Sequence, residues 1–390
     1  MSSKSYSKTC LFWILLLLTL IALINRVVDP FWYYRDPQIV GFNSTKTEFH
    51  SYEKQIKPFV LKQSHPEVLI FGNSFFEIGL NPSHPSLTKN GSYHSYNFAM
   101  AASEWDKVYC HVLYAMDNTN LKTVIIGIAP GSLPIIDCIV QNNSLGKIEL
   151  QTLLLSFDAL RGSFNTLRHQ HKPPTHTVDG LFFYHRNNSP QIEQVFKFYF
   201  DRYLKLSSSK SCSNITDVFP SAWTYPNNFE NLAGLRNILE LLVSRKINVK
   251  LVVYPYHALW MELLMNCGET VQRWQSLYAI AMLVDEINQN HALIELWDFQ
   301  GTSDMLTERI VNNKVKYWQD HGHFNYEMGD AMLDVIFNQR SVKSESSQDQ
   351  FGVLLTKSSV AERFKSFIEN RNNFVQRNPW FVDDLKKLTR

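Results

Sequence analysis

Short apolar runs alternate with amphipathic helical stretches between residues 67 and 340. Helical spacing of apolar residues occurs at 103–116, 232–245 and 269–288, and again after Asn325, which suits an N-cap. A predicted strand, helix and strand follow one another between residues 94 and 129. This is about the size of a strand-helix-strand unit, in which the two strands are parallel. The pattern predicts an α/β fold with a doubly wound, mainly parallel sheet of five strands. The runs typical of buried strands are residues 68–71, 94–100, 121–129, 249–254 and 293–298.

Two segments depart from this alternation. Residues from about 132 to 224 mix polar loops with helical stretches, which predicts a partly helical insertion. Within it, His169, His171 and His176 have the close spacing of some metal ligands, but their polar, proline-interrupted surroundings favour a solvated cluster. Residues 341–390 begin as a polar linker and continue as a helical tail without recognisable chemistry.

The longest apolar run lies near the N-terminus. Lys4 and Lys8 precede an apolar stretch at 11–24, which Cys10 and a snorkelling Arg26 extend to about the 20 residues that span a bilayer. A cleaved signal peptide has the same outline, but no small-x-small cleavage site follows the run. We therefore predict a cytoplasmic segment at 1–9, an uncleaved signal anchor at 10–28 and a connector at 29–66. The rest of the chain is expected outside the cytoplasm.

The aromatic residues Trp32, Tyr33 and Tyr34 follow the predicted anchor directly. They suit the headgroup level of a membrane, and packing on the folded part of the chain is an equal alternative. An even number of cysteines follows the anchor, which is compatible with disulfides in an oxidising compartment and equally with buried thiols. The sequence does not specify any pairing of Cys110, Cys138, Cys212 and Cys267.

Composition excludes some classes of partner. The 390 residues are 45% hydrophobic and 19% charged, as in a globular chain able to bury one large core or two smaller ones. A net charge of +2 without a basic stripe argues against nucleic acid. Because the chain has neither a Gly-rich phosphate loop nor an H-E-x-x-H motif, the sequence implies no metal and no other cofactor.

Candidate chemistry lies at the end of the first predicted strand, in the turn Gly72-Asn73-Ser74. Open parallel sheets keep their reactive groups at this carboxyl edge. Asp320 stands three residues before His323, so its carboxylate can orient the imidazole while the other ring nitrogen faces a serine. We therefore predict a catalytic set of Ser74, His323 and Asp320. His321 is an alternative base, and the G-x-S-x-G elbow of α/β-hydrolases is absent.

These motifs together resemble the SGNH/GDSL hydrolase superfamily. Gly72-Asn73-Ser74 follows the first strand, Asn97 follows the second, and Asp320-x-x-His323 precedes the last helix. Over roughly residues 11–337 the order resembles that of membrane-anchored, SGNH-like proteins of bacterial envelopes, many of them linked to surface-polysaccharide modification. The resemblance implies a three-layer α/β/α, flavodoxin-like domain at 67–340.

The resemblance also implies roles for individual residues. Ser74 would be the nucleophile, His323 the base and Asp320 its orienter. The Ser74 N–H would belong to an oxyanion hole with Gly72, Asn73 and Asn97 in support. Two departures stand out: position 73 is Asn where the family has Asp, and no Gly-x-Asn-Asp block follows the third strand.

Two further residues keep two interpretations each. Asn97 either replaces the missing oxyanion asparagine or holds its own turn by hydrogen bonds. His257, in Tyr254-Pro-Tyr-His257 after the fourth strand, either contacts substrate or packs in the core.

The function implied is that of an acyl-ester hydrolase or an O-acyltransferase, with an acetyl group as the expected acyl group. Its substrate would be an acylated envelope or surface polysaccharide, and glycan-assembly proteins would be its partners. The protein would sit in the inner membrane by a single span, with the domain on the periplasmic side. The alternative is a catalytically inactive SGNH-fold scaffold or glycan-binding protein.

Overall fold

The computed structural model describes residues 3–139, 145–184, 191–206, 231–338, 342–343 and 349–389. The chain divides into two compact units. Met1–His65 and Cys138–Phe183 form the first, here called the N-terminal unit. Pro66–Asp137 and Tyr184–Arg390 form the second, here called the α/β unit. The segment predicted as a connector therefore packs with part of the predicted insertion.

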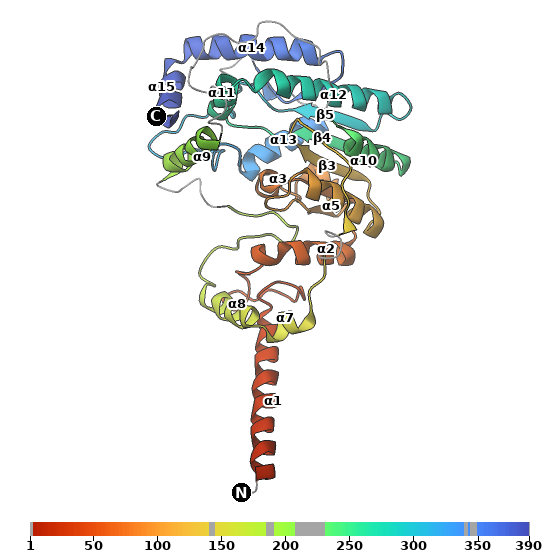
Figure 1. Cartoon of the computed structure of the whole chain (residues 1–390), viewed down its shortest axis with the longest axis vertical. Coiled ribbons are helices and arrows are strands. Elements are labelled where there is room, and N and C mark those ends of the chain that lie inside the picture. Colours follow the sequence, from red (N-terminus) through yellow and green to blue (C-terminus); the bar gives the residue numbers. More distant parts are fainter. Residues whose placement is uncertain are drawn as a thin grey trace. The chain divides into compact units, whose positions relative to one another are not determined.

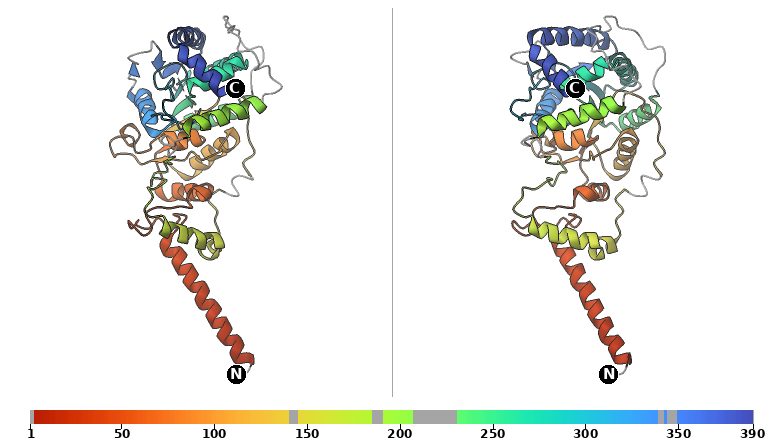
Figure 2. Two further views of the ribbon diagram at one scale, coloured as in Figure 1. Left: turned by 90° about the vertical axis from the view of Figure 1, so that its left-hand side faces the viewer. Right: turned by 60° about the vertical axis from the view of Figure 1, so that its left-hand side comes forward.

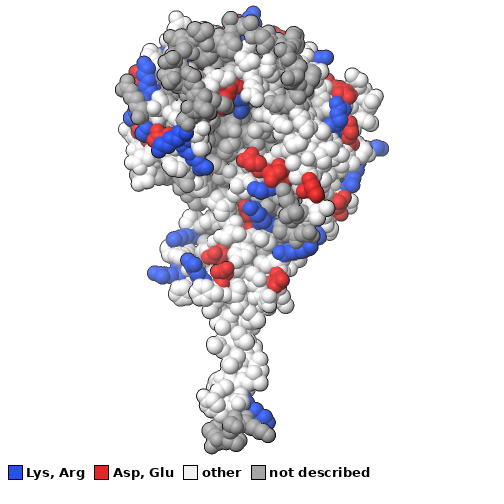
Figure 3. Space-filling view, viewed as in Figure 1, with Lys and Arg blue, Asp and Glu red and all other residues white. Residues whose placement is uncertain are grey.

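The N-terminal unit is built on helix α1 (Ser3–Val28), which contains the predicted anchor. Among the described residues, this is the one helix long and apolar enough to cross a membrane, over Tyr6–Val28 with a mean hydropathy of 2.4. Its surface is almost free of charge and forms the white shaft in Figure 3. The unit also contains η1 (His50–Tyr52), α2 (Glu53–Ser64), α7 (Leu150–Leu155) and α8 (Phe157–Arg168).

The aromatic residues after α1 pack on the protein. Trp32 is buried with its ring edge-on to Phe49, and Tyr33 stacks on Phe59 with ring centroids 4.1 Å apart. Of the two interpretations of this aromatic run, the structure supports packing for these two side chains.

The prediction of a solvated histidine cluster is wrong for His176. Its ring is buried and stacks on Phe182 at 4.5 Å, whereas His171 is exposed and His169 is half-buried. The local sequence is polar, but Phe182, six residues along the chain, and Phe49, from a distant segment, both pack on the ring.

The α/β unit contains the predicted mainly parallel sheet. Among the described residues, six strands lie in the order β2-β1-β3-β4-β5-β8, and the first five pair in parallel. The predicted count of five strands is corrected by β8 (Val353–Leu355), which comes from the predicted tail and pairs antiparallel with β5. The parallel strands are β1 (Val68–Phe71), β2 (Ser95–Asn97), β3 (Thr123–Ile128), β4 (Asn248–Val253) and β5 (Ile294–Asp298).

Burial explains why the strands read as continuous apolar runs. Every residue of β1 and β3 is buried, as expected for central strands of a parallel sheet with both faces covered. Helix α5 (Trp105–Asn118) packs against β1, α10 (Ala233–Ser244) against β4, and α12 (Thr270–Asn288) against β5. Figures 1 and 2 show these helices beside the sheet.

The helices expected at 103–116, 232–245 and 269–288 are confirmed, as is the one after Asn325. That last helix is α13 (Tyr326–Asn338), and the Asn325 side chain caps it by accepting a hydrogen bond from the Met328 N–H at 3.2 Å. The predicted insertion contributes the helices α7, α8 and α9 (Ile192–Leu206). The remaining elements are α3 (Ser74–Gly79), α4 (Pro85–Thr88), α11 (Ala258–Asn266), β6 (Val342–Lys343), β7 (Gln350–Phe351), α14 (Val360–Arg377) and α15 (Pro379–Thr389).

The C-terminal segment is an integral part of the α/β unit. Buried Arg363 on α14 forms ion pairs with Asp298 at the end of β5 (3.1 Å) and with Asp349 (2.9 Å). An arginine is buried only when its charge is compensated, and here two carboxylates do so. The interpretation of residues 341–390 as a separate linker and tail is therefore corrected for 349–389.

Candidate active site

Ser74 stands where the sequence places it, at the carboxyl end of β1. It is the first residue of α3, and the Asn73 side chain caps this helix by accepting a hydrogen bond from the Phe75 N–H at 3.0 Å. The turn is short because β1 ends at Phe71 and α3 begins three residues later. The Ser74 hydroxyl consequently lies at the edge of the sheet and not in its interior.

The structure brings the three predicted catalytic side chains together. Ser74 Oγ is 2.7 Å from His323 Nε2, and His323 Nδ1 is 2.7 Å from Asp320 Oδ2. Because an ionised carboxylate only accepts hydrogen bonds, His323 Nδ1 carries the ring proton and Nε2 accepts from the serine. This is the tautomer that a general base for serine needs.

Local backbone geometry fixes Asp320 for this role. Its Oδ1 accepts hydrogen bonds from the Gly322 N–H (3.0 Å) and the His323 N–H (2.9 Å), which leaves Oδ2 for the imidazole. The carboxylate is fully buried, and burial alone would raise its pKa. The hydrogen bond from His323 and the charges of the neighbouring imidazoles outweigh burial and lower the pKa of Asp320 to about 2. Asp320 is therefore ionised at neutral pH.

Close helix packing sets the separation between the serine and the histidine. Helices α3 and α13 are in contact, and a Cβ added to Gly329 would lie 1.7 Å from the Gly79 carbonyl oxygen. A Cβ on Gly79 would overlap the ring of Phe324, the residue after His323. Glycine at both positions lets the two elements approach closely enough for Ser74 and His323 to meet.

Gly72 and Asn73 support the turn through Tyr254, a residue that sequence reasoning missed. The Asn73 N–H donates to the buried Tyr254 hydroxyl at 3.0 Å. Gly72 and Gly127 leave room for this ring, since a Cβ at either position would lie within 2.8 Å of it. Burial raises the pKa of Tyr254, so its hydroxyl stays protonated. The available signal was its position as the last residue of the fourth predicted strand, at the same sheet edge.

Asn97 holds a turn. Its side-chain amide donates to the Phe76 and Leu80 carbonyls, each at 2.8 Å, and its Oδ1 accepts from the Ala99 N–H. The side chain is fully buried. Both amide protons therefore serve the end of α3, and of the two interpretations of Asn97 the structural one fits this geometry.

His257 and His321 are also committed to the protein interior. His257 Nε2 donates to the Glu308 carbonyl (2.8 Å) while Nδ1 accepts from the Leu259 N–H (3.2 Å), which caps α11. Burial lowers the pKa of His257 to about 4. His321 packs against Trp260 with ring centroids 4.0 Å apart, and burial lowers its pKa to about 4 as well. His323 is the histidine hydrogen-bonded to Ser74.

Aromatic rings surround the reactive pair, and sequence reasoning did not single them out. The Phe75 ring lies edge-on to His323 at 4.8 Å, and the Tyr184 ring lies 5.9 Å from it. Tyr256 lies 5.6 Å from Phe75. A Cβ on Gly322 would overlap Phe75, so this glycine makes room for the ring beside His323. These rings lower the local polarity around the imidazole and give the site an apolar wall.

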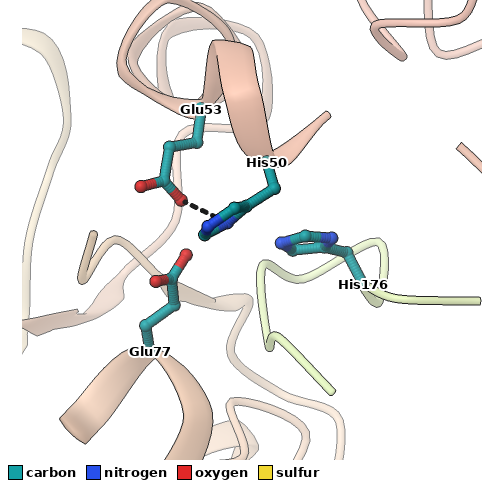
Figure 4. Close-up of side chains that lie close together, drawn as sticks. All are labelled: His50, Glu53, Glu77 and His176. Carbon is teal, nitrogen blue, oxygen red and sulfur yellow. Dashed lines mark ion pairs between the residues drawn. The ribbon is translucent and has the colours of Figure 1, made fainter. Parts of the chain in front are cut away.

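A separate group of potential metal ligands lies in the N-terminal unit. Ligand atoms of His50, Glu53 and His176 are within 4.8 Å of one another, and His50 Nδ1 is 3.6 Å from Glu53 Oε2 (Figure 4). The ammonium of buried Lys57 lies 3.7 Å from the same carboxylate oxygen. Because that cation already compensates the carboxylate and would repel a divalent ion, we assign no metal to this group.

No protein-family model matches this sequence, and no curated protein matches it.

Proposed function

We propose that this chain is a serine acyl-ester hydrolase or O-acyltransferase of SGNH type that acts on O-acetyl groups of an envelope or surface polysaccharide. The observation that carries the proposal is the continuous hydrogen-bonded set from Ser74 through His323 to Asp320, with 2.7 Å at each step. A serine becomes a nucleophile when an adjacent base takes its proton, and a base keeps its orientation through a third group. Ser74, His323 and Asp320 can fill these three roles of nucleophile, base and orienting group.

In the proposed reaction, Ser74 Oγ attacks the acyl carbon while its proton passes to His323 Nε2. Asp320 stabilises the imidazolium that forms, and the Ser74 N–H donates to the oxyanion. The tetrahedral intermediate expels the sugar alkoxide, which takes the proton from His323, and an acyl-serine remains. Water or a second sugar hydroxyl, deprotonated by the same histidine, then releases the acyl group. Water makes the protein an esterase, and a sugar makes it a transferase.

The proposed location is the extracytoplasmic side of the inner membrane. Helix α1 is long and apolar enough to be a single-pass anchor. Cys110, Cys138 and Cys267 each belong to a disulfide, whereas Cys10 within α1 is free, and Cys212 lies outside the described residues. Disulfides persist in oxidising compartments, which supports placing the domain outside the cytoplasm with Lys4 and Lys8 inside. Envelope glycan-assembly proteins are the partners that this location would offer.

The test uses the full chain in detergent with a chromogenic acetyl ester and, separately, an O-acetylated polysaccharide. The proposal predicts acetate release that disappears in Ser74→Ala and persists in Ser83→Ala, a matched change at an exposed serine. With a deacetylated glycan added, appearance of acetyl on that glycan identifies a transferase.

One observation favours the second candidate, a non-catalytic scaffold or glycan-binding protein of the same fold. Asn97 uses both amide protons within the protein and so offers none to an oxyanion. Suppose that the folded wild-type chain turns over neither substrate, yet binds the polysaccharide as tightly as the Ser74→Ala variant does. That result would support the scaffold and contradict the enzyme.

A further inference from the structure

Large apolar side chains are exposed on the N-terminal unit outside α1. They lie on helices α7 and α8, where Leu150 is 63%, Phe157 76% and Phe164 63% exposed, and Leu155 is 46% exposed. Isolated exposed apolar residues are ordinary, but several on two consecutive short helices indicate a surface that is covered in the working state.

These helices pack at the C-terminal end of α1. Both contact α1 and each other. The Asn25 side chain donates to the Leu154 carbonyl at 2.8 Å, and Ser163 Oγ donates to Asn25 Oδ1 at 2.7 Å. Figures 1 and 2 show α7 and α8 crossing this end of α1, with α2 farther from the N-terminus. Asn25 is buried, whereas Leu23 and most apolar residues before it are exposed. The helices therefore pack near the C-terminal end of the exposed apolar surface of α1, which extends to Val27.

The loop that contains Ile39 and Val40 also lies at the C-terminal end of α1. Ile39 and Val40 are 58% and 90% exposed. Their loop is fastened to α1 through Asn43, whose side chain accepts a hydrogen bond from the Ile39 N–H and donates to the Val27 carbonyl. A second apolar surface is thus tied to the last turn of α1.

We propose that Ile39, Val40, Leu150, Leu155, Phe157 and Phe164 form an apolar collar around the end of α1 that inserts into the interfacial region of the bilayer crossed by this helix. A lipid surface is the occupant because the collar continues the apolar surface of α1 within one compact unit. In-plane helices with aromatic residues on one face bind membranes in this way.

The charges on α8 fit the same occupant. Arg161 and Arg168 are exposed and alternate with the exposed phenylalanines along the helix, at positions 157, 161, 164 and 168. Long arginine side chains can bury their stems among acyl chains while their guanidinium groups reach lipid phosphates. Asp158 is the exposed acidic group of this helix, at its N-terminal end, where the helix dipole stabilises a negative charge.

The consequence is a two-part attachment. Helix α1 alone would leave the N-terminal unit free to tilt, whereas apolar contacts from α7, α8 and the loop of Ile39 and Val40 would fix this unit at the interface.

The experiment measures immersion depth by electron paramagnetic resonance on the full chain in nanodiscs containing anionic lipid. In a Cys10→Ser background, spin labels are attached at Phe164→Cys, at Val40→Cys and, as a matched control in the same unit, at exposed Lys54→Cys on α2. We expect collision with oxygen to exceed collision with a water-soluble nickel chelate at positions 164 and 40, and the opposite at 54. The chelate collision rate at 164 should be at least five-fold below that at 54.

Equal chelate accessibility at 164, 40 and 54 in nanodiscs would overturn the proposal, whether the collar then faces water or awaits a protein partner. Because all three sites are exposed, labelling should leave the thermal unfolding midpoint in detergent unchanged, which confirms that each labelled chain is folded. The result is independent of catalysis, so the collar and the proposed enzyme succeed or fail separately.

Discussion

Gly329→Ala is the substitution that most directly probes how the fold positions the site. In an ordinary helix this change stabilises by about 1 kcal/mol through helix propensity. Here the new Cβ would lie 1.7 Å from the Gly79 carbonyl oxygen, and real Cβ atoms essentially never approach other atoms within 3.0 Å. Helices α3 and α13 must therefore separate by more than 1 Å.

That separation acts on the hydrogen bond between Ser74 and His323, because α3 begins at Ser74 and α13 begins shortly after His323. A donor–acceptor distance of 2.7 Å would lengthen beyond hydrogen-bond range. A misplacement of about 1 Å between reacting groups costs about 100-fold in rate. Overpacking adds a loss of roughly 1–3 kcal/mol in the free energy of unfolding. We therefore expect slower ester turnover together with lower stability.

The assay combines chemical unfolding with turnover of an acetyl ester by the folded fraction. Glu327→Ala, at an exposed position of the same helix, is the control and should match the wild type in both measurements. A Gly329→Ala chain that is as stable as the wild type and equally active would refute the inferred role of this close contact.

Three further predictions concern charged and titratable groups. Asp320→Asn should slow ester turnover by about 10³-fold or more, because His323 loses the partner that fixes its tautomer; it should also cost about 2 kcal/mol of unfolding free energy at pH 7, a contribution the wild type loses only as pH falls from 3.8 toward 2. His257 stays neutral in the fold with its pKa lowered to about 4, while the unfolded chain protonates near 6.5. This residue should therefore contribute about 3 kcal/mol to the fall in unfolding free energy from pH 7 to pH 4, and His257→Gln should remove that share while the similar share of His321 remains. Arg363→Met leaves two buried carboxylates without their cation and should lower the unfolding free energy by about 3–5 kcal/mol, measured by urea titration.

The sheet was predictable because its strands are continuous apolar runs. The runs at 68–71 and 121–129 correspond to central strands that are buried throughout, so hydrophobicity alone marks them. The strand β8 was not predictable in the same way, since it has three residues and Leu354 remains 42% exposed at the sheet edge. Its place in the sheet depends on the antiparallel pairing with β5.

The meeting of Ser74 and His323 was predictable from topology. Each residue lies in a loop at the carboxyl edge of the parallel sheet, and loops at this edge come together. Tyr254 was harder to foresee, because its role depends on the space left by Gly72 and Gly127 and on a hydrogen bond to the Asn73 N–H. Such contacts between distant parts of the chain leave no periodicity in a single sequence.

The burial of His176 illustrates a second limit. Polar and proline-rich neighbours in the sequence predict exposure, whereas the ring is covered by aromatic side chains that include Phe49 and Phe182. The polarity of a short window does not report that a bridge to Phe182 and a distant ring such as Phe49 will cover the imidazole.

The proposed function requires Ser74 to be a nucleophile activated by His323. Incubation of the full chain with a serine-directed fluorophosphonate, followed by mass spectrometry of its peptides, measures this reactivity. One adduct is expected on the peptide containing Ser74, absent in Ser74→Ala and strongly reduced in His323→Gln. A folded wild-type chain without any adduct, or an adduct that persists unchanged in Ser74→Ala, would contradict it.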